Sequence, residues 1–444
     1  MKKMLKKTLK LSIIALLACL AALPGAAAAT AGAGAGAGAA SQGGAGAVTL
    51  KDVKEAKEVR IVIDGVPGAY SDTALRINDR ILLPFREILT KLGVRNDDEH
   101  IIWNGAERSV TAKTDAGEIK LLIGDKTIMK DGRPIAFDVA PYIYPINSRT
   151  YVPVRAVAEL MDKLVEWDGD SSTVYVRDKA NYEQALGVLA AQRGAGGQLK
   201  RFRAKAAGSV SLVVSSDDVD IPGAQGQDGL TIRQAVNTEV EADAERDIFH
   251  MTQSTSVLGL TVKTEIYITK GRMFMKAPGA GLLSKGGWSD VTGDALADMS
   301  GILKNALSAG YSPGGADAER LALGFSVSPR AGGGYSIAGE FVNKSEVDAM
   351  ANILLKSLNM SGDGADMGVR INRYSMESEI GKDYMPISAK TDASFDMSLT
   401  RKGADGKSAA IGARAGYTLD MSYSDVNASF IIALPAEVAA LLAK

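Results

Sequence analysis

Two stretches of this 444-residue sequence closely resemble each other: "RILLPFREILTKL", Arg80–Leu92, and "RTYVPVRAVAEL", Arg149–Leu160. Three positions repeat at a constant offset of 69 residues, since Arg80, Pro84 and Arg86 return as Arg149, Pro153 and Arg155. Internal repetition of this kind indicates a supersecondary unit that is built twice. The two stretches therefore decide how the whole region from about Val59 to Asp178 is interpreted.

The apolar residues after each proline fall at i, i+3, i+4 and i+7, which is the spacing of one helical face. They are Phe85, Ile88, Leu89 and Leu92 in the first copy and Val154, Val157, Ala158 and Met161 in the second. Proline suits the first helical turn because the N–H that it lacks would have no partner there. Each copy is therefore predicted to form a short helix with one buried face, directly after an extended apolar run.

A tryptophan and a turn dipeptide follow each predicted helix, as Trp103-Asn104-Gly105 and as Trp167-Asp168-Gly169. Asn-Gly and Asp-Gly favour the tight turn that joins two antiparallel strands. The first copy holds five additional residues between proline and tryptophan, which we place in "RNDDEH", Arg95–His100. Each copy is interpreted as strand, helix, strand, tryptophan turn and strand, and the two copies are expected to share one sheet and one core.

This doubled pattern resembles the copper amine oxidase N-terminal-like domain, a stalk-type module of exported bacterial proteins. The resemblance rests on "INDRILLPFREIL" from Ile77, "INSRTYVPVRAVAEL" from Ile146 and "VEWDGDSSTVYVRD" from Val165, and it covers residues 59–178. It implies a stalk and not an oxidase, because copper catalysis of that kind needs three histidine ligands and the chain has only His100 and His250. No metal and no cofactor are expected.

The repeated arginines and tryptophans have two interpretations each. Arg86 and Arg155 stand in a first helical turn, where the helix dipole disfavours a cation, so another group should hold each of them. We favour a partner inside the repeat over the carboxylate of a ligand. Trp103 and Trp167 are interpreted as core anchors that cover their turns, with stacking on the sugar rings of a wall polymer as the alternative. The positions predicted to be structural are thus Pro84, Arg86, Trp103, Pro153, Arg155 and Trp167.

Residues 1–29 have the order of a secretory signal peptide. Five lysines lie between Lys2 and Lys10, the apolar run Leu11–Leu23 follows, and the small residues Ala26–Ala29 suit cleavage. We therefore expect a secreted, cell-envelope-associated protein without a transmembrane segment in the mature chain. The alternative is lipid attachment at Cys19, the one cysteine of the chain, which the continuing apolar run disfavours.

Two connecting segments are expected. Residues 30–58 are predicted to be a flexible tether, since Thr30–Ala47 is almost wholly glycine and alanine. Residues 179–207 are predicted to be a linker with a helix, Asn181–Arg193, and a basic cluster between Lys200 and Lys205. After cleavage the chain would carry 46 basic and 52 acidic side chains, which argues against nucleic acid as a partner.

Residues 208–444 alternate polar and apolar side chains over many stretches, as strands do. Two helical patterns interrupt them, Thr292–Ala309 and a second pattern that starts at Ser345. The order resembles the lipoprotein-carrier type of half-barrel and, more narrowly, a family of exported bacterial proteins of unassigned function with a terminal "YSDVN" followed by proline. The predicted fold class is therefore α+β: a small duplicated β-α-β-hairpin domain, then a mainly antiparallel curved sheet with packed helices.

Methionines suggest what this second domain binds. Methionine is flexible and polarizable, so it suits a cavity that adapts to apolar ligands. The predicted ligand-binding residues are Met273, Met275, Met299, Leu303, Met350 and Leu354. They imply a lipid or another apolar ligand, and ordinary core filling is the alternative.

No pattern in the chain indicates catalysis, since it has no Gly-x-Ser-x-Gly elbow, no Walker loop and no zinc signature. "DGDSS" at Asp168–Ser172 lacks the spacing of a calcium loop, and His250 on its strand is interpreted as structural. We therefore expect a non-catalytic protein whose stalk or adhesion domain presents a domain that binds an apolar ligand or partner. The alternative is a purely structural protein without a cavity, whose repeat domain contacts cell-wall polymer.

Overall fold

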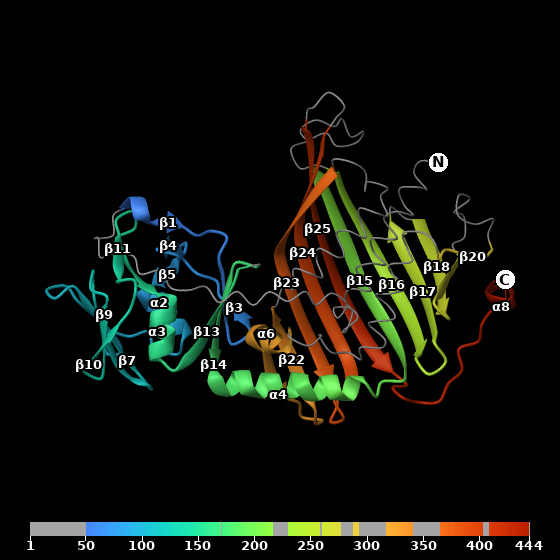
Figure 1. The fold of residues 1–444 in the computed structure, drawn as a ribbon, viewed down its shortest axis with the longest axis horizontal. Helices are drawn as coiled ribbons and strands as arrows, with labels where there is room; N and C mark the ends of the chain where they lie inside the picture. The colour runs from blue at the N-terminus through green and yellow to red at the C-terminus, as the bar shows by residue number, and fades with distance from the viewer. Residues whose placement is uncertain are drawn as a thin grey trace. The chain divides into compact units, whose positions relative to one another are not determined.

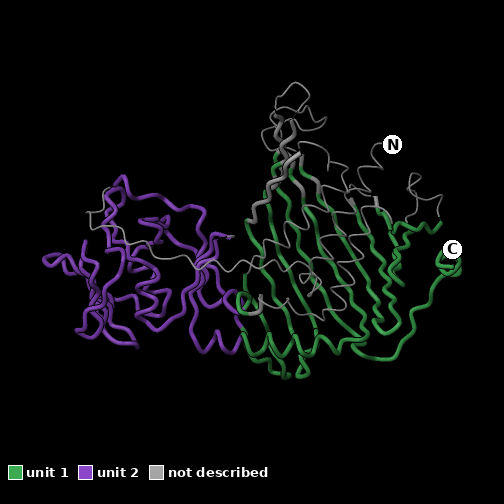
Figure 2. Tube along the Cα trace, viewed as in Figure 1, with its two compact units in different colours: residues 1–31, 186–321, 327–444 green, residues 32–185, 322–326 purple. Residues whose placement is uncertain are grey.

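The computed structural model describes residues 50–169, 171–215, 230–257, 260–276, 287–292, 317–340, 365–402 and 408–443. The chain divides into two compact units (Figure 2). The N-terminal unit contains residues 32–185 and 322–326, and the C-terminal unit contains residues 1–31, 186–321 and 327–444. Strands predominate over helices in the described residues (Figure 1).

The N-terminal unit is built of short strands in three sheets. The sheet β1-β4-β5-β12-β11 comprises Lys54–Glu55, Leu75–Ile77, Arg80–Pro84, Arg149–Pro153 and Tyr142–Tyr144. The sheet β10-β9-β8-β7-β6 comprises Arg133–Ala136, Thr127–Lys130, Gly117–Leu122, Ser109–Thr114 and Ile101–Asn104. The sheet β13-β14-β2-β3 comprises Lys163–Asp168, Thr173–Asp178, Arg60–Ile63 and Val66–Pro67, and the 3-10 helix η1 is Leu50–Asp52.

The prediction of one sheet shared by both copies is wrong. The copies pair through β5 and β12, where Leu83 lies opposite Val152 in antiparallel register. Their tryptophan hairpins lie in different sheets, because the first hairpin, β6–β7, continues into β8, β9 and β10. The second hairpin, β13–β14, instead pairs in parallel with β2, which comes from before the first copy.

Helices α2, Phe85–Lys91, and α3, Val154–Leu160, confirm the two helices predicted from the repeat. Each begins directly after its proline, with Pro84 or Pro153 at the N-cap position. Their buried residues are Ile88 and Leu89 in α2, and Val154, Ala156, Val157, Ala158 and Leu160 in α3. These side chains join one core with residues of all three sheets, and full burial of each larger one stabilises the unit by roughly 1.5–3 kcal/mol.

The C-terminal unit is built around one sheet of eleven strands, ordered β20-β19-β18-β17-β16-β15-β25-β24-β23-β22-β21 (Figure 1). The strands are β15 Arg201–Ser215, β16 Leu230–Asp243, β17 Ile248–Val257, β18 Leu260–Thr269, β19 Arg272–Lys276, β20 Ser289–Asp290, β21 Phe325–Pro329, β22 Tyr335–Glu340, β23 Ala365–Ile380, β24 Pro386–Lys402 and β25 Ser408–Ser424. The other helices among the described residues, besides α2 and α3, are α4 Lys179–Gly196, α6 Asp317–Gly324 and α8 Ala436–Leu442. The expected mainly antiparallel, curved sheet is present. Its first strand, β15, begins inside the predicted linker, at Arg201.

The two faces of this sheet differ in chemistry because side chains alternate along each strand. On β15, Phe202, Ala204 and Ala206 are buried in the apolar cluster of the unit. The intervening Arg203 and Lys205 point to the other face, which we call the polar face. Both β16 and β25 pair with β15, so the first and last long strands are neighbours at the centre of the sheet.

One described helix packs against the large sheet. Val438 of α8 is fully buried in a cluster with Tyr267 of β18 and Phe274 of β19. Apart from its first residue, Thr292, the predicted helix Thr292–Ala309 lies outside the described residues, as does the whole of the one expected after Ser345. Of the predicted α+β fold, the structure therefore supports a mainly β protein with few helices and a curled half-barrel sheet.

Candidate functional site

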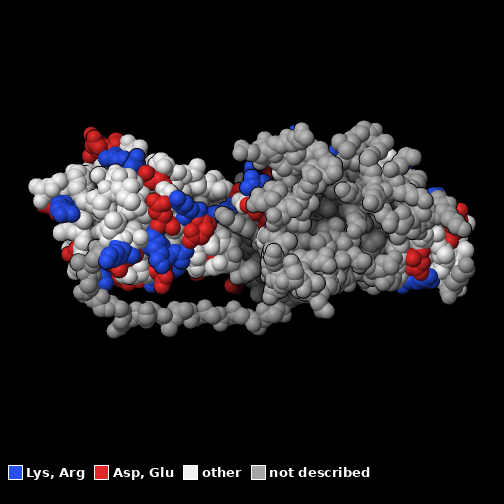
Figure 3. All heavy atoms as spheres, turned by 90° about the horizontal axis from the view of Figure 1, so that it is seen from above, with Lys and Arg blue, Asp and Glu red and all other residues white. Residues whose placement is uncertain are grey.

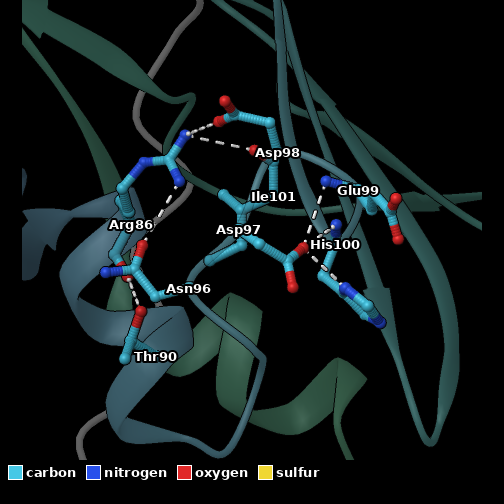
Figure 4. A network of polar contacts seen from close by, with 8 residues as sticks. All are labelled: Arg86, Thr90, Asn96, Asp97, Asp98, Glu99, His100 and Ile101. Atoms are coloured by element: carbon cyan, nitrogen blue, oxygen red, sulfur yellow. Dashed lines mark hydrogen bonds and ion pairs between the residues drawn. The ribbon is translucent and has the colours of Figure 1, made fainter.

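Arg86, at the start of α2, is held by the loop that the first copy inserts (Figure 4). Its guanidinium donates to Asn96 Oδ1 at 3.2 Å, to Asp98 Oδ1 at 3.1 Å and to the Ile101 carbonyl at 3.2 Å. Asn96 and Asp98 belong to the inserted segment 95–100. The prediction of a partner inside the repeat is confirmed for this arginine, so the network joins the helix to the first tryptophan hairpin.

Asp97 fixes the shape of the same loop (Figure 4). Its Oδ1 accepts from the backbone N–H groups of Glu99 at 3.1 Å and His100 at 2.8 Å, and lies 2.6 Å from His100 Nδ1. The hydrogen bond with the His100 side chain lowers the pKa of the Asp97 carboxyl. Asp97 and His100 thus build a turn, as short polar side chains do between strands and helices.

Arg155, the counterpart of Arg86, lies beside no such loop, because the second copy lacks the insertion. Its Nη1 is 3.5 Å from Glu159 Oε1, one helical turn along α3. Both side chains are nearly half exposed, at 47% and 45%. An exposed pair at this spacing contributes about 0.3–0.5 kcal/mol, so the two repeated arginines differ in what they stabilise.

Trp103 and Trp167 are the last residues but one of β6 and β13. Their side chains are 41% and 40% exposed, so the prediction that they are core anchors is wrong. Each indole does lie against its turn. A Cβ on Gly105 would stand 3.6 Å from Trp103 Nε1, and one on Gly169 would stand 3.4 Å from Trp167 Nε1. Burial is incomplete because each tryptophan is the last large residue before its turn, where the sheet ends.

The basic cluster predicted for the linker is paired along β15 and β16. The register places Arg201, Arg203 and Lys205 directly opposite Asp243, Glu241 and Glu239. The corresponding nitrogen-to-oxygen distances are 3.0, 2.8 and 3.0 Å. Cross-strand pairs of opposite charge stabilise a sheet, so this cluster is an internal ladder of ion pairs.

A groove of about 810 Å³ runs along the polar face. The described residues that line it come from β15 to β18 and from β22 to β25. Its lysines are Lys205, Lys263 and Lys390, and its carboxylates are Glu239, Glu377, Glu379 and Asp420. Most of the remaining lining side chains are serine, threonine or asparagine, among them Asn237, Thr252 and Ser254. The groove is therefore a polar surface that carries both signs of charge.

Several of these charges have no partner among the described residues. In the register, Lys390 lies opposite Glu377 on one side and Asp420 on the other. None of the three side chains forms a hydrogen bond or an ion pair of 4 Å or less with another described residue, and the same is true of Lys263. Glu379 differs, because Arg330 holds it at 2.9 Å. The centre and one end of the groove thus present unpaired charges of opposite sign.

His250 lies on the polar face beside the groove and bridges two carboxylates. Its Nδ1 is 3.1 Å from Glu241 Oε2, its Nε2 is 3.1 Å from Glu265 Oε1, and its ring stacks on Tyr267. Burial raises the pKa of Glu241, but hydrogen bonds from Arg203 and His250 outweigh burial and leave that pKa below its usual value. Burial and the two carboxylates raise the pKa of Tyr267 to about 12. His250 therefore joins three strands, which agrees with the structural interpretation.

Two of the predicted ligand-binding residues are described, and neither lines this groove. Met273 and Met275 of β19 are 0% and 5% exposed and belong to the apolar cluster on the opposite face of the sheet. Met299, Leu303, Met350 and Leu354 lie outside the described residues. The alternation of side chains along the strands predicts that the sheet has a polar face. The sequence could not show that Glu377, Lys390 and Asp420 are neighbours on that face, because the register between distant strands determines which residues lie opposite each other.

The other predicted features have plain structural settings. Ser171 Oγ donates to Asp168 Oδ2 at 2.8 Å inside the second turn, where no calcium loop was expected. Within the described ranges, His, Cys, Asp and Glu side chains form no group of three or more that could hold a metal ion. No helix in the described part of the chain is long and apolar enough to cross a membrane.

Comparisons with known proteins bear on the N-terminal unit. Residues 62–176 match the family model of the copper amine oxidase N-terminal domain, which is the non-catalytic domain of those enzymes. No curated protein matches the sequence. Among solved structures, the ywiB protein from Bacillus subtilis aligns with 50% of this chain and 93% of its own, at 6% identity and a TM-score of 0.15. A TM-score this low supports no conclusion, so the resemblance to lipoprotein carriers stays a prediction.

Proposed function

We propose that this chain is an exported, non-catalytic binding protein in which a stalk-like domain carries a half-barrel that holds a ligand on its polar face. The groove with its unpaired charges carries this proposal. Sites that bind small molecules are concave and contain a few well-placed polar groups, and this groove offers both.

The ligand that suits this groove is polar and carries charges of both signs. Lys390 and Asp420 stand directly opposite each other, so a ligand with an anionic and a cationic group can satisfy both at once. Hydroxyl and amide side chains around them supply hydrogen bonds that fix its orientation. The polar groove thus replaces the apolar cavity as the leading site.

Site-specific cross-linking in the exporting cell tests the groove and identifies its ligand in the same experiment. A photoreactive phenylalanine would replace either Asp420, which lines the groove, or Arg414, which lies on the same face of β25 outside the described groove lining. We expect adducts at position 420 that mass spectrometry can identify, and none at position 414. Equal yields at both positions, or no adduct at 420, would contradict the proposal.

An apolar ligand is a second candidate, because the opposite face concentrates methionines. Met251, Met273, Met275 and Met421 all lie in its apolar cluster. Organic extraction of the purified protein followed by mass spectrometry separates the two candidates. Recovery of stoichiometric lipid favours the apolar face, and recovery of none favours the groove.

Export is part of the proposal and has its own test. The lysine-rich start, the apolar run Leu11–Leu23 and the alanines that follow support it. Mass spectrometry of the mature N-terminus is expected to place it just after these alanines. A diacylglyceryl group on Cys19 would show an anchored protein instead.

A further inference from the structure

We infer that the two tryptophan hairpins of the N-terminal unit are a pair of stacking sites for the pyranose rings of a polysaccharide. The inference is independent of the groove and concerns the other unit. Trp103 and Trp167 are the bulkiest of the exposed apolar side chains in the described residues. Burial of these rings would stabilise the unit, since a tryptophan is a large apolar side chain. Their exposure in both copies leaves part of each ring open to a ligand.

Each indole has a buried valine opposite it on the neighbouring strand and a glycine in its turn. The register places Val110 opposite Trp103 and Val174 opposite Trp167, and both valines are at most 5% exposed. The turn glycine lies against the indole nitrogen in both copies. A flat aromatic surface that is fixed before binding loses little conformational entropy when a ligand stacks on it.

The two hairpins share this exposed ring although their turns differ in sequence. In the first turn, Asn104 Oδ1 accepts from the backbone N–H groups of Ala106 and Glu107 at 3.1 and 3.2 Å. In the second turn, Asp168 Oδ2 accepts from the Ser171 hydroxyl at 2.8 Å. The exposed indole is thus present in both copies, beside an asparagine in one turn and an aspartate in the other.

The surroundings fit a sugar better than an apolar protein segment. Arg76 lies 5.8 Å from the centre of the Trp167 ring, and Glu58 holds it at 3.1 Å. A pyranose has a flat face of C–H groups that stacks on an aromatic ring, and a rim of hydroxyls that bind such polar neighbours. Protein partners instead need a contiguous apolar patch, which single rings on separate sheets do not provide.

The charge of the unit points to an uncharged polymer with repeated rings. Basic and acidic side chains are mixed over the part of the N-terminal unit seen in Figure 3, so that view shows no patch of a single sign to attract a polyanion. Two similar sites on one unit are suited to a ligand that repeats, because the second contact of a polymer is intramolecular and strengthens the first. The ligand class is therefore a neutral, linear polysaccharide.

Oligomers of β-1,4-linked N-acetylglucosamine are the probe. The full mature protein carries Trp288→Phe, so that its fluorescence reports on Trp103 and Trp167 alone. We expect the hexamer to change this fluorescence and to bind more tightly than the dimer. Affinities of the variants are measured by calorimetric titration, which needs no tryptophan. Loss of one stacked ring, in Trp103→Leu or Trp167→Leu, should weaken binding by roughly two- to tenfold, and the double variant should lose most of it.

Two controls keep the test specific. Ile146, which is 70% exposed, is replaced by alanine to remove an exposed apolar side chain that has no ring, and binding should not change. Phenylalanine at positions 103 and 167 should retain part of the affinity that leucine loses, with circular dichroism showing that each variant is folded. Equal binding by the wild type and the double leucine variant would overturn the inference. So would the absence of binding to this probe and to soluble glucan and mannan oligomers.

Discussion

Replacing Arg86 by alanine should destabilise the N-terminal unit far more than replacing its repeat counterpart, Arg155. The contact with Asp98 adds little, because the Asp98 side chain is 96% exposed. The contact with the part-buried Ile101 carbonyl matters more, since an unpaired buried acceptor costs about 1–3 kcal/mol. With a smaller contribution from Asn96, we expect a loss of about 2 kcal/mol for Arg86→Ala and about 0.3–0.5 kcal/mol for Arg155→Ala.

The free energy of unfolding is measured by urea denaturation of the full chain with Trp288→Phe. The fluorescence then reports on the N-terminal unit alone, which matters because a two-unit protein need not unfold in one step. The midpoint should fall for Arg86→Ala at an unchanged dependence on urea, which identifies a change in stability rather than in the unfolded state. Equal losses for the two arginine variants would refute the role assigned to the inserted loop.

Three further outcomes are expected. The hydrogen bond from Lys163 lowers the pKa of Asp178 in the folded state. The ionised Asp178 carboxylate therefore stabilises the fold above its unfolded pKa of about 3.9, and this stabilisation is lost as pH falls through its folded pKa. Asp178→Asn should therefore destabilise the unit at pH 7, and the difference from the wild type should shrink as pH falls through the lowered pKa of Asp178, as urea titrations at pH 7 and at successively lower pH would show. Gly208→Ala should lower the free energy of unfolding by about 1–3 kcal/mol, because a Cβ at position 208 would collide with the Thr418 carbonyl of β25. Ser209→Ala should change it little, and calorimetric unfolding of both variants tests the difference. Val438→Ala should lower the free energy of unfolding by roughly 1.5–3 kcal/mol and increase hydrogen exchange in α8, since the side chain is fully buried against the sheet. Ala440→Ser, at an exposed position of the same helix, is the matched control and should have no effect.

The repeat predicts local structure well because its signals are local. Proline at the helix start and apolar residues at helical spacing place α2 and α3 where the structure has them. Comparison of the two copies locates the inserted segment 95–100, which supplies the partners of Arg86. Nothing local decides which sheet a hairpin joins, so the sequence does not predict the pairing of β14 with β2.

Side-chain roles are harder to predict than elements. Large apolar residues usually bury themselves, which favours a core position for Trp103, but its place at the end of β6 leaves part of the ring uncovered. The segment with the basic cluster around Arg203 is interpreted as a linker from the sequence, because the acidic partners that place it in a strand lie some forty residues later, on β16. Met273 and Met275 fill the apolar cluster, whereas the charges of the groove meet through the register of β23, β24 and β25.

The central claim is that the polar groove is the binding surface, and calorimetric titration of the ligand captured at position 420 tests it most directly. Wild-type protein, Lys390→Ala and Arg414→Ala would be compared at equal ionic strength. Lys390→Ala removes one charged contact and should bind the ligand about ten- to a hundredfold more weakly, since hydrogen bonds to charged groups contribute about 1.5–3 kcal/mol. Arg414→Ala should bind it as tightly as the wild type. Equal affinities for all three proteins would contradict the claim.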